Sequence, residues 1–132
     1  MSASAVLGTA DADGRPHLVP VTFALVAAET DDRVLIAVDD KPKRTTDLKR
    51  LRNIADNPAV CLLADRYDDD WSRLWWARAD GVARIVMEAA DLFEGLLDEL
   101  RGRYPHYADS APAGPFIVVT VERWSGWSFA DQ

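Results

Sequence analysis

Residues 33–65, RVLIAVDDKPKRTTDLKRLRNIADNPAVCLLAD, decide the fold because they predict a helix between two β-rich runs. The first run, RVLIAV, is typical of a strand, and it ends before Pro42 because proline has no N–H to donate to a sheet. Thr45 or Thr46 offers a hydroxyl N-cap, so we expect the helix to begin there. The helical pattern stops before Pro58, and AVCLLAD then predicts the next strand.

The expected helix is amphipathic. Its apolar residues Leu48, Leu51, Ile54 and Ala55 recur at a spacing of three to four positions and therefore share one face. The opposite face is basic. We expect the apolar face to pack against the sheet and the cations to lie at the surface.

Further β-rich runs lie on both sides of this segment. The first two are separated by DADGR, whose Asp-Gly pair can adopt the positive φ angles of a tight hairpin turn. The pair Asp80-Gly81 interrupts a longer run and indicates a bend between two strand segments. The expected strands cover residues 6–10, 17–25, 33–38, 59–65, 71–86 and 116–124, and a second helix is expected over 89–104.

Short strands joined by hairpins, with inserted helices, favour an α+β, mainly β fold that forms a small antiparallel barrel with two helices. The chain has 132 residues and no linker-like tract, so we expect one domain over residues 1–132. It contains no GxGxxG motif, which argues against a nicotinamide-binding doubly wound sheet.

Composition excludes several classes of partner. The net charge of −7 opposes general attraction to nucleic acid or to an anionic membrane. No apolar run approaches the ~20 residues that span a bilayer, and the start MSASAVLGTA lacks a basic n-region, so a cytoplasmic location is expected. The single cysteine, Cys61, lies in an apolar run and is expected to be a small core residue.

Positive charge is concentrated around the predicted start of the first helix. The unsatisfied N–H groups there, the helix dipole and the threonine hydroxyls all favour a bound phosphate or carboxylate. One alternative is an ordinary solvated helix face. Another is a nucleic-acid patch, although the sequence shows no matching basic face or recognition motif elsewhere. Six of the chain's 15 Lys and Arg residues form this cluster: Lys41, Lys43, Arg44, Lys49, Arg50 and Arg52.

Tryptophan is also clustered. In strand geometry Trp76 and Arg78 share one face, whereas Trp75 lies on the other. Such rings pack a core, a subunit interface or the face of a planar cofactor. The C-terminal WSGW places Trp124 and Trp127 around Gly126, where one ring can lie on the barrel and the other on a partner, or both can simply tether the tail.

Metal and hydrolytic sites have little support. His17 and His106 have no ligand partners at zinc spacing, and the aspartates of residues 65–70 lack the calcium-loop pattern. No GxSxG elbow is present. No metal is therefore expected, and no residue stands out as an obligatory catalytic acid or base.

Three consecutive segments together resemble a known family. They are TADADGRPHLVPVTF (9–23), LIAVDDKPKRTTDLKRLRNIADNPAVCLLADRY (35–67) and DWSRLWWARADGVARI (70–85). Their order resembles the pyridoxamine-phosphate-oxidase-like family of FMN-binding split barrels, and within it the actinobacterial coenzyme F420-dependent oxidoreductases. The resemblance runs from residue 6 to residue 127, although relatives have an amphipathic helix before the first strand where this chain has only MSASA.

The resemblance implies a homodimer that holds its cofactor at the subunit interface. Lys49 and Arg50 match the basic pair that precedes the helix end in relatives, and Arg52 is their neighbour. The implied cofactor-binding residues are Val19, Pro20, Val21 and Thr22 for the ring, Lys43, Arg44, Thr45, Thr46, Lys49 and Arg50 for the phosphate, and Trp76 and Arg78 for an approach across the interface.

The resemblance also implies the chemistry, which is hydride transfer between reduced F420 and a small unsaturated organic substrate. Several cations favour F420 modestly over FMN, because F420 carries an anionic glutamate tail besides its phosphate. Two alternatives stay open. One is an FMN-dependent oxidoreductase, and the other is a protein that binds a flavin, a deazaflavin or a haem-like ring without turnover.

Overall fold

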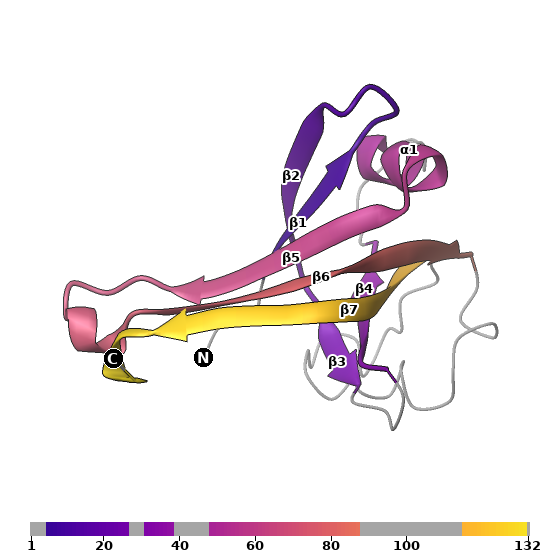
Figure 1. The fold of residues 1–132 in the computed structure, drawn as a ribbon. Coiled ribbons are helices and arrows are strands. Elements are labelled where there is room, and N and C mark those ends of the chain that lie inside the picture. The colour runs from indigo at the N-terminus through magenta and orange to yellow at the C-terminus, as the bar shows by residue number, and fades with distance from the viewer. Residues whose placement is uncertain (1–4, 27–30, 39–47, 88–114, 132) are drawn as a thin grey trace.

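The structure is a computed structural model that describes residues 5–26, 31–38, 48–87 and 115–131. Within these ranges the chain forms one seven-stranded antiparallel sheet, one α-helix and two short 3₁₀ helices (Figure 1). The elements are β1 (Ala5–Ala10), β2 (Pro16–Val21), β3 (Ala24–Val26), β4 (Arg33–Ala37), α1 (Lys49–Asp56), β5 (Ala59–Arg66), η1 (Trp71–Arg73), β6 (Trp75–Val86), β7 (Phe116–Ser128) and η3 (Phe129–Asp131).

The strand order β2-β1-β5-β6-β7-β4-β3 curls the sheet into a split barrel, as predicted. Its two edge strands, β2 and β3, are consecutive in sequence and are separated only by Thr22 and Phe23. The prediction of one strand over residues 17–25 is therefore wrong. Because β2 pairs with β1 and β3 pairs with β4 at the opposite edge, the chain must leave one edge and join the other at this point.

The hairpin between β1 and β2 is confirmed. Gly14 has a φ of 85°, in the left-handed region that glycine adopts without strain. The Asp11 carboxylate organises the turn, since its Oδ1 accepts hydrogen bonds from the backbone N–H groups of Asp13 and Arg15, each at 2.9 Å. The turn therefore follows from local side-chain chemistry.

Strands β6 and β7 form the longest ladder of the sheet. A register shift between Asp80 and Gly81 confirms the predicted bend. Strand β6 begins at Trp75 rather than at Trp71, because Trp71–Arg73 form the 3₁₀ turn η1. The Asp70 carboxylate caps this turn by accepting a hydrogen bond from the backbone N–H of Ser72. The last strand extends to residue 128, so WSGW lies within β7 and is not a loose tail.

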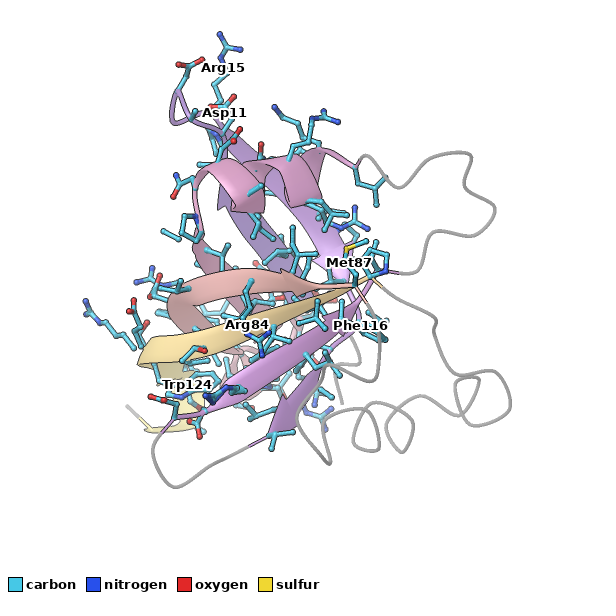
Figure 2. The ribbon with its side chains drawn as sticks, turned by 90° about the vertical axis from the view of Figure 1, so that its right-hand side faces the viewer. Asp11, Arg15, Arg84, Met87, Phe116 and Trp124 are labelled. Carbon is cyan, nitrogen blue, oxygen red and sulfur yellow. The ribbon has the colours of Figure 1, made fainter. Side chains whose placement is uncertain are left out.

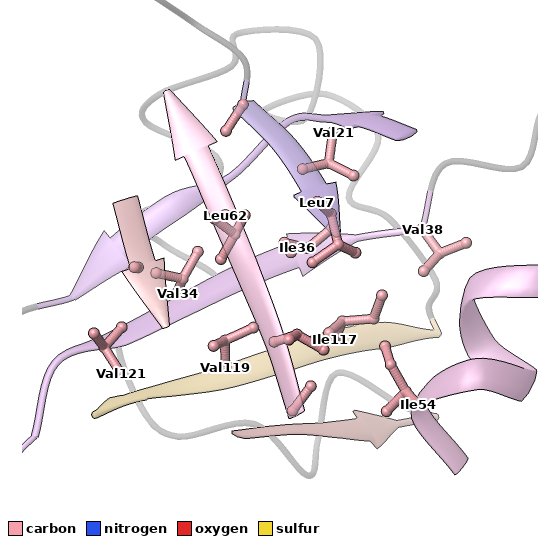
Figure 3. Close-up of a cluster of buried hydrophobic side chains, with 14 residues drawn as sticks. Leu7, Val21, Val34, Ile36, Val38, Ile54, Leu62, Ile117, Val119 and Val121 are labelled. Carbon is pink, nitrogen blue, oxygen red and sulfur yellow. The ribbon is translucent and has the colours of Figure 1, made fainter. Parts of the chain in front are cut away.

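The main core lies inside the barrel (Figure 3). Alternate side chains of the strands meet there, and Ile54 of α1 closes one end of the cluster. A second buried cluster lies on the other face of β4 and β7, around Leu35, Phe116 and Val118. Cys61 is only partly buried, which corrects the expectation that it is a core residue.

The helix α1 begins at Lys49, with Leu48 as its N-cap, so the predicted start at Thr45 or Thr46 is wrong. The apolar face is also corrected at one position, because Ala55 is exposed and Asn53 is buried. The predicted second helix over 89–104 lies outside the described residues. No helix in the described part of the chain combines the length and the apolar character needed to cross a bilayer.

Candidate functional site

The helix α1 is held on the barrel by one buried polar contact. Asn53 Nδ2 donates a hydrogen bond to Thr9 Oγ1 of β1 at 3.0 Å, and the two residues are 2% and 4% exposed. Sequence reasoning missed this pair, because an asparagine within a basic helix is typical of the solvent face. The contact fixes where the cations of α1 lie relative to β1 and β2.

We expect Asn53→Ala to lower the free energy of unfolding by about 1–3 kcal/mol, because the Thr9 hydroxyl would lose its partner in a buried position. Urea unfolding of the wild type and the variant measures this. The control is Thr9→Val combined with Asn53→Leu, which removes both polar groups and should recover part of the loss. An Asn53→Ala variant as stable as the wild type would contradict the anchoring role.

Lys49 lies at the start of α1, beside the β1–β2 hairpin. Its Nζ is 3.7 Å from Asp11 Oδ2, in an ion pair that stays largely open to solvent on the lysine side. The pKa of the Asp11 carboxyl is lowered, first by the hydrogen bond from the Arg15 backbone N–H and also by Lys49. Exposed pairs of this kind contribute little to stability, so Lys49 can exchange Asp11 for another anion at low cost. Figure 2 shows Asp11 and Arg15 at the hairpin tip, close to α1.

Arg50 is half-buried and differs from its neighbour. Its Nε is inaccessible to solvent, and no hydrogen-bond acceptor for it is found among the described residues. Burial lowers the pKa of the Arg50 guanidinium from its ordinary value. A buried donor without an acceptor costs free energy, and a bound anion would remove that cost.

A second buried polar atom without a hydrogen-bond partner among the described residues lies in β2, next to β1. His17 of β2 is the Cα partner of Thr9, and its Nδ1 is buried without a hydrogen-bond partner in the described structure. The sequence reasoning weighed His17 only as a zinc ligand. Its pairing with Thr9 depends on the hairpin register and places it on the same face as the Asn53 anchor.

The rest of the predicted phosphate site is not placed. Lys43, Arg44, Thr45 and Thr46 lie outside the described residues. The structure therefore brings together Lys49, Arg50 and the hairpin, and it leaves the remainder of the cationic cluster as a prediction.

The predicted ring contacts lie at the edge of the sheet. Val19 and Val21 point toward the core, whereas Pro20 is exposed on the outer face of β2. Thr22 follows the strand and is partly exposed. Because β2 pairs only with β1 among the described strands, a ring laid along this edge meets backbone groups and Pro20 rather than the two valines.

Trp76 and Arg78 lie far from α1 within one chain. They occupy the part of β6 that extends, with β5 and β7, beyond the barrel (Figure 1). The N–H of Ala83, in the same strand, donates a hydrogen bond to Pro58 O just after α1, so Trp76 lies about 23 Å along the strand from that point at ~3.3 Å per residue. Arg78 Nε donates to Asp80 Oδ2 at 3.0 Å.

The two residues do share a face, as predicted. Trp76 is the Cα partner of Trp127, and Trp127 packs edge to face on Phe129 with ring centroids 6.3 Å apart. All three aromatic side chains are partly exposed. These rings form an aromatic surface on the outer face of the β5–β7 extension, and it stays partly exposed in the described chain.

The chain matches a family model described as pyridoxamine 5'-phosphate oxidase over residues 2–128. No curated protein sequence matches it closely enough to name a relative.

Several solved structures share the fold. The heme storage protein HutZ of Vibrio cholerae is 19% identical with a TM-score of 0.66, and the match covers 96% of this chain and 85% of that one. An FAD-binding protein of Mycobacterium smegmatis is 21% identical with a TM-score of 0.58, and the match covers 96% and 84%. An FAD-binding protein of Mesorhizobium loti is 19% identical with a TM-score of 0.62, and the match covers 95% and 83%.

Proposed function

The chain belongs to the pyridoxamine 5'-phosphate oxidase family, and from this premise we propose that it is an oxidoreductase with a flavin-type cofactor, specifically coenzyme F420. Its substrate in this proposal is a small unsaturated organic molecule that accepts a hydride. FMN is the alternative cofactor. The FAD-binding proteins of the same fold support a flavin-type ring in a barrel of this kind.

The observation that carries the proposal is the Arg50 Nε, which is buried and has no hydrogen-bond partner among the residues that the structure describes. Its neighbour Lys49 adds a second positive charge, which pairs with Asp11 at 3.7 Å while the lysine side chain stays 45% exposed. A phosphate at this position would accept hydrogen bonds from Arg50 and exchange with the Asp11 carboxylate at Lys49. The residues present therefore fit an anionic cofactor group.

In this proposal Lys49 and Arg50 bind the phosphate, together with Lys43, Arg44, Thr45 and Thr46. The outer edge of β2, at Val19, Pro20, Val21 and Thr22, supports the ring, largely through backbone groups. When bound, F420 supplies hydride chemistry, because carbon replaces the flavin N5 in its ring. The protein contributes orientation and the exclusion of water, which is consistent with the lack of an evident acid or base.

We further propose a homodimer with the cofactor at the subunit interface. Trp76 and Arg78 are too far from α1 to meet the same cofactor from one chain, but a second copy can bring its β5–β7 extension across. The exposed aromatic surface of Trp76, Trp127 and Phe129 supports this arrangement, since aromatic residues are enriched in subunit interfaces.

The test is a fluorescence titration of the purified protein with F420 and, separately, with FMN, on samples whose mass is measured by sedimentation equilibrium. We expect a dimer that binds F420 more tightly than FMN. Preference for FMN would move the protein to the alternative, and binding of neither would overturn the cofactor proposal. Reduced cofactor that is not oxidised faster by any unsaturated acceptor would instead indicate storage, as in the heme storage protein of this fold.

A further inference from the structure

An apolar pocket of about 170 Å³ lies at the opposite end of the barrel from α1. Figure 2 shows Trp124, one of its walls, far from Asp11 and the helix. The pocket is open on one side and every side chain that lines it is apolar, including Phe23, Leu25, Ala64, Trp75, Ala77 and Trp124. None of the cations of α1 reaches it.

Two small residues, Ala64 and Ala77, lie side by side in the pocket lining. Ala77 of β6 is the Cα partner of Ala64 on one side and of Gly126 on the other, so three small residues lie in one row across β5, β6 and β7. Trp75 and Trp124 stand on the same face of these strands, at diagonal positions around Ala77. The space over these small residues, between the two indole rings, can accept a planar ring.

One of the two walls is held in place before any ligand binds. The Trp124 indole Nε1 donates a hydrogen bond to Asp32 Oδ2 at 2.7 Å. This contact uses the only polar atom of the ring, so Trp124 presents hydrocarbon alone to the pocket. The side chain is nevertheless 46% exposed, and a rigid half-exposed indole gains contact area when a ring packs against it.

We propose that this pocket binds a small uncharged aromatic molecule, about the size of a substituted benzene. Cavities of roughly 150 Å³ with apolar walls accept benzene, and this pocket is of comparable size. An uncharged ring is favoured over a charged one, because the described lining offers a carboxylate neither a cation nor a hydrogen-bond donor. The inference goes beyond the cofactor proposal, since it needs neither Lys49 nor Arg50.

The experiment uses the full chain labelled with 5-fluorotryptophan and titrated with toluene, with benzoate as the charged control. The five ¹⁹F signals are assigned by single Trp→Phe variants. We expect toluene to shift the signals of Trp75 and Trp124 saturably, while that of Trp71 stays in place and benzoate has no effect. Equal shifts with both probes, or no shift with toluene, would overturn the proposal.

Two variants test whether toluene binds in this pocket or elsewhere on the protein. Ala77→Leu fills the floor and should weaken toluene binding by at least about tenfold, whereas Val82→Leu, on the exposed face of the same strand, should not change it. Ala64→Val replaces Ala77→Leu if that variant does not fold. If Ala77→Leu alters the sedimentation mass and leaves toluene binding unchanged, the pocket holds a second copy and the proposal is wrong.

The cofactor proposal and the pocket proposal can be tested separately with one double variant. Lys49→Ala with Arg50→Ala should leave the toluene titration unchanged, whatever its effect on F420. Loss of toluene binding in that variant would show that the two sites are not separate, and this would overturn the inference.

Discussion

Gly81→Ala is expected to lower the free energy of unfolding by about 3 kcal/mol or more, the largest effect of a methyl group added at any of the described glycines. Gly81 is buried in β6, at the register shift where the strand bends against β7. An added Cβ would overlap the backbone carbonyl oxygen of Thr120 and lie 3.1 Å from Val119 Cγ1. The clash follows from crowding alone, since Gly81 does not have a positive φ.

Relief of this clash requires movement of backbone. Thr120 lies in β7, which pairs with β4 on its other side, so β7 cannot move away from Gly81 without disturbing both ladders. A flexible side chain could rotate aside, whereas a carbonyl within a sheet cannot. We therefore expect the variant to unfold at much lower urea concentration or to be recovered as aggregate.

Urea unfolding followed by circular dichroism measures the effect, with Gly14→Asn as the control. Gly14 has a φ of 85°, a Cβ added there would have no atom within 4 Å, and asparagine tolerates this backbone region. The control should cost less than about 1 kcal/mol. Similar losses in the two variants would mean that crowding at the bend is not the cause.

Lys49→Ala combined with Arg50→Ala is expected to weaken cofactor binding by about 100-fold or more, the largest functional effect. Charge-assisted hydrogen bonds to phosphate are about twice as strong as neutral ones, and the variant removes two of their donors. The same change should cost little stability, because the lysine of the Lys49–Asp11 pair is open to solvent and the Arg50 Nε has no partner to lose among the described residues.

The matched control removes two cations elsewhere. Arg66 and Arg73 lie near the far end of β5 and in η1, where they pair with Asp68 and Asp70. Arg66→Ala with Arg73→Ala produces the same change in net charge, and we expect it to leave F420 affinity within about threefold of the wild type at physiological salt. Equal weakening in both double variants would assign the effect to overall charge and not to a phosphate site.

Local signals predicted much of the fold. The Asp-Gly hairpin, the amphipathic helix, the bend at Gly81 and the order of β-rich runs each depend on residues close together in sequence, and the structure has all of them. Two of the errors lie at positions where a distant partner decides. The run over 17–25 became two strands because its halves pair at opposite edges of the sheet, and β7 continued past Trp124 because β6 is long enough to pair with it.

The candidate site divides in the same way. The basic pair Lys49 and Arg50 was identified from sequence. The buried Asn53–Thr9 contact was not, and neither was the buried His17 Nδ1, which has no hydrogen-bond partner in the described part of the chain. Asn53 and Thr9 are 44 positions apart, so no periodicity links them. The apolar pocket is a further case, because Phe23, Ala64 and Trp124 meet only after the sheet curls.

The sequence by itself therefore determined the class of fold, the turn chemistry and the presence of Lys49, Arg50 and Arg52 on the first helix, because hydrophobic periodicity, turn residues and charge act over short separations. Tertiary structure alone decided which edge of the sheet each strand joins, which polar groups are buried and which side chains line the apolar pocket. The physical reason is that burial and strand pairing depend on what a distant segment presents, and this exists only once the sheet has curled around its core.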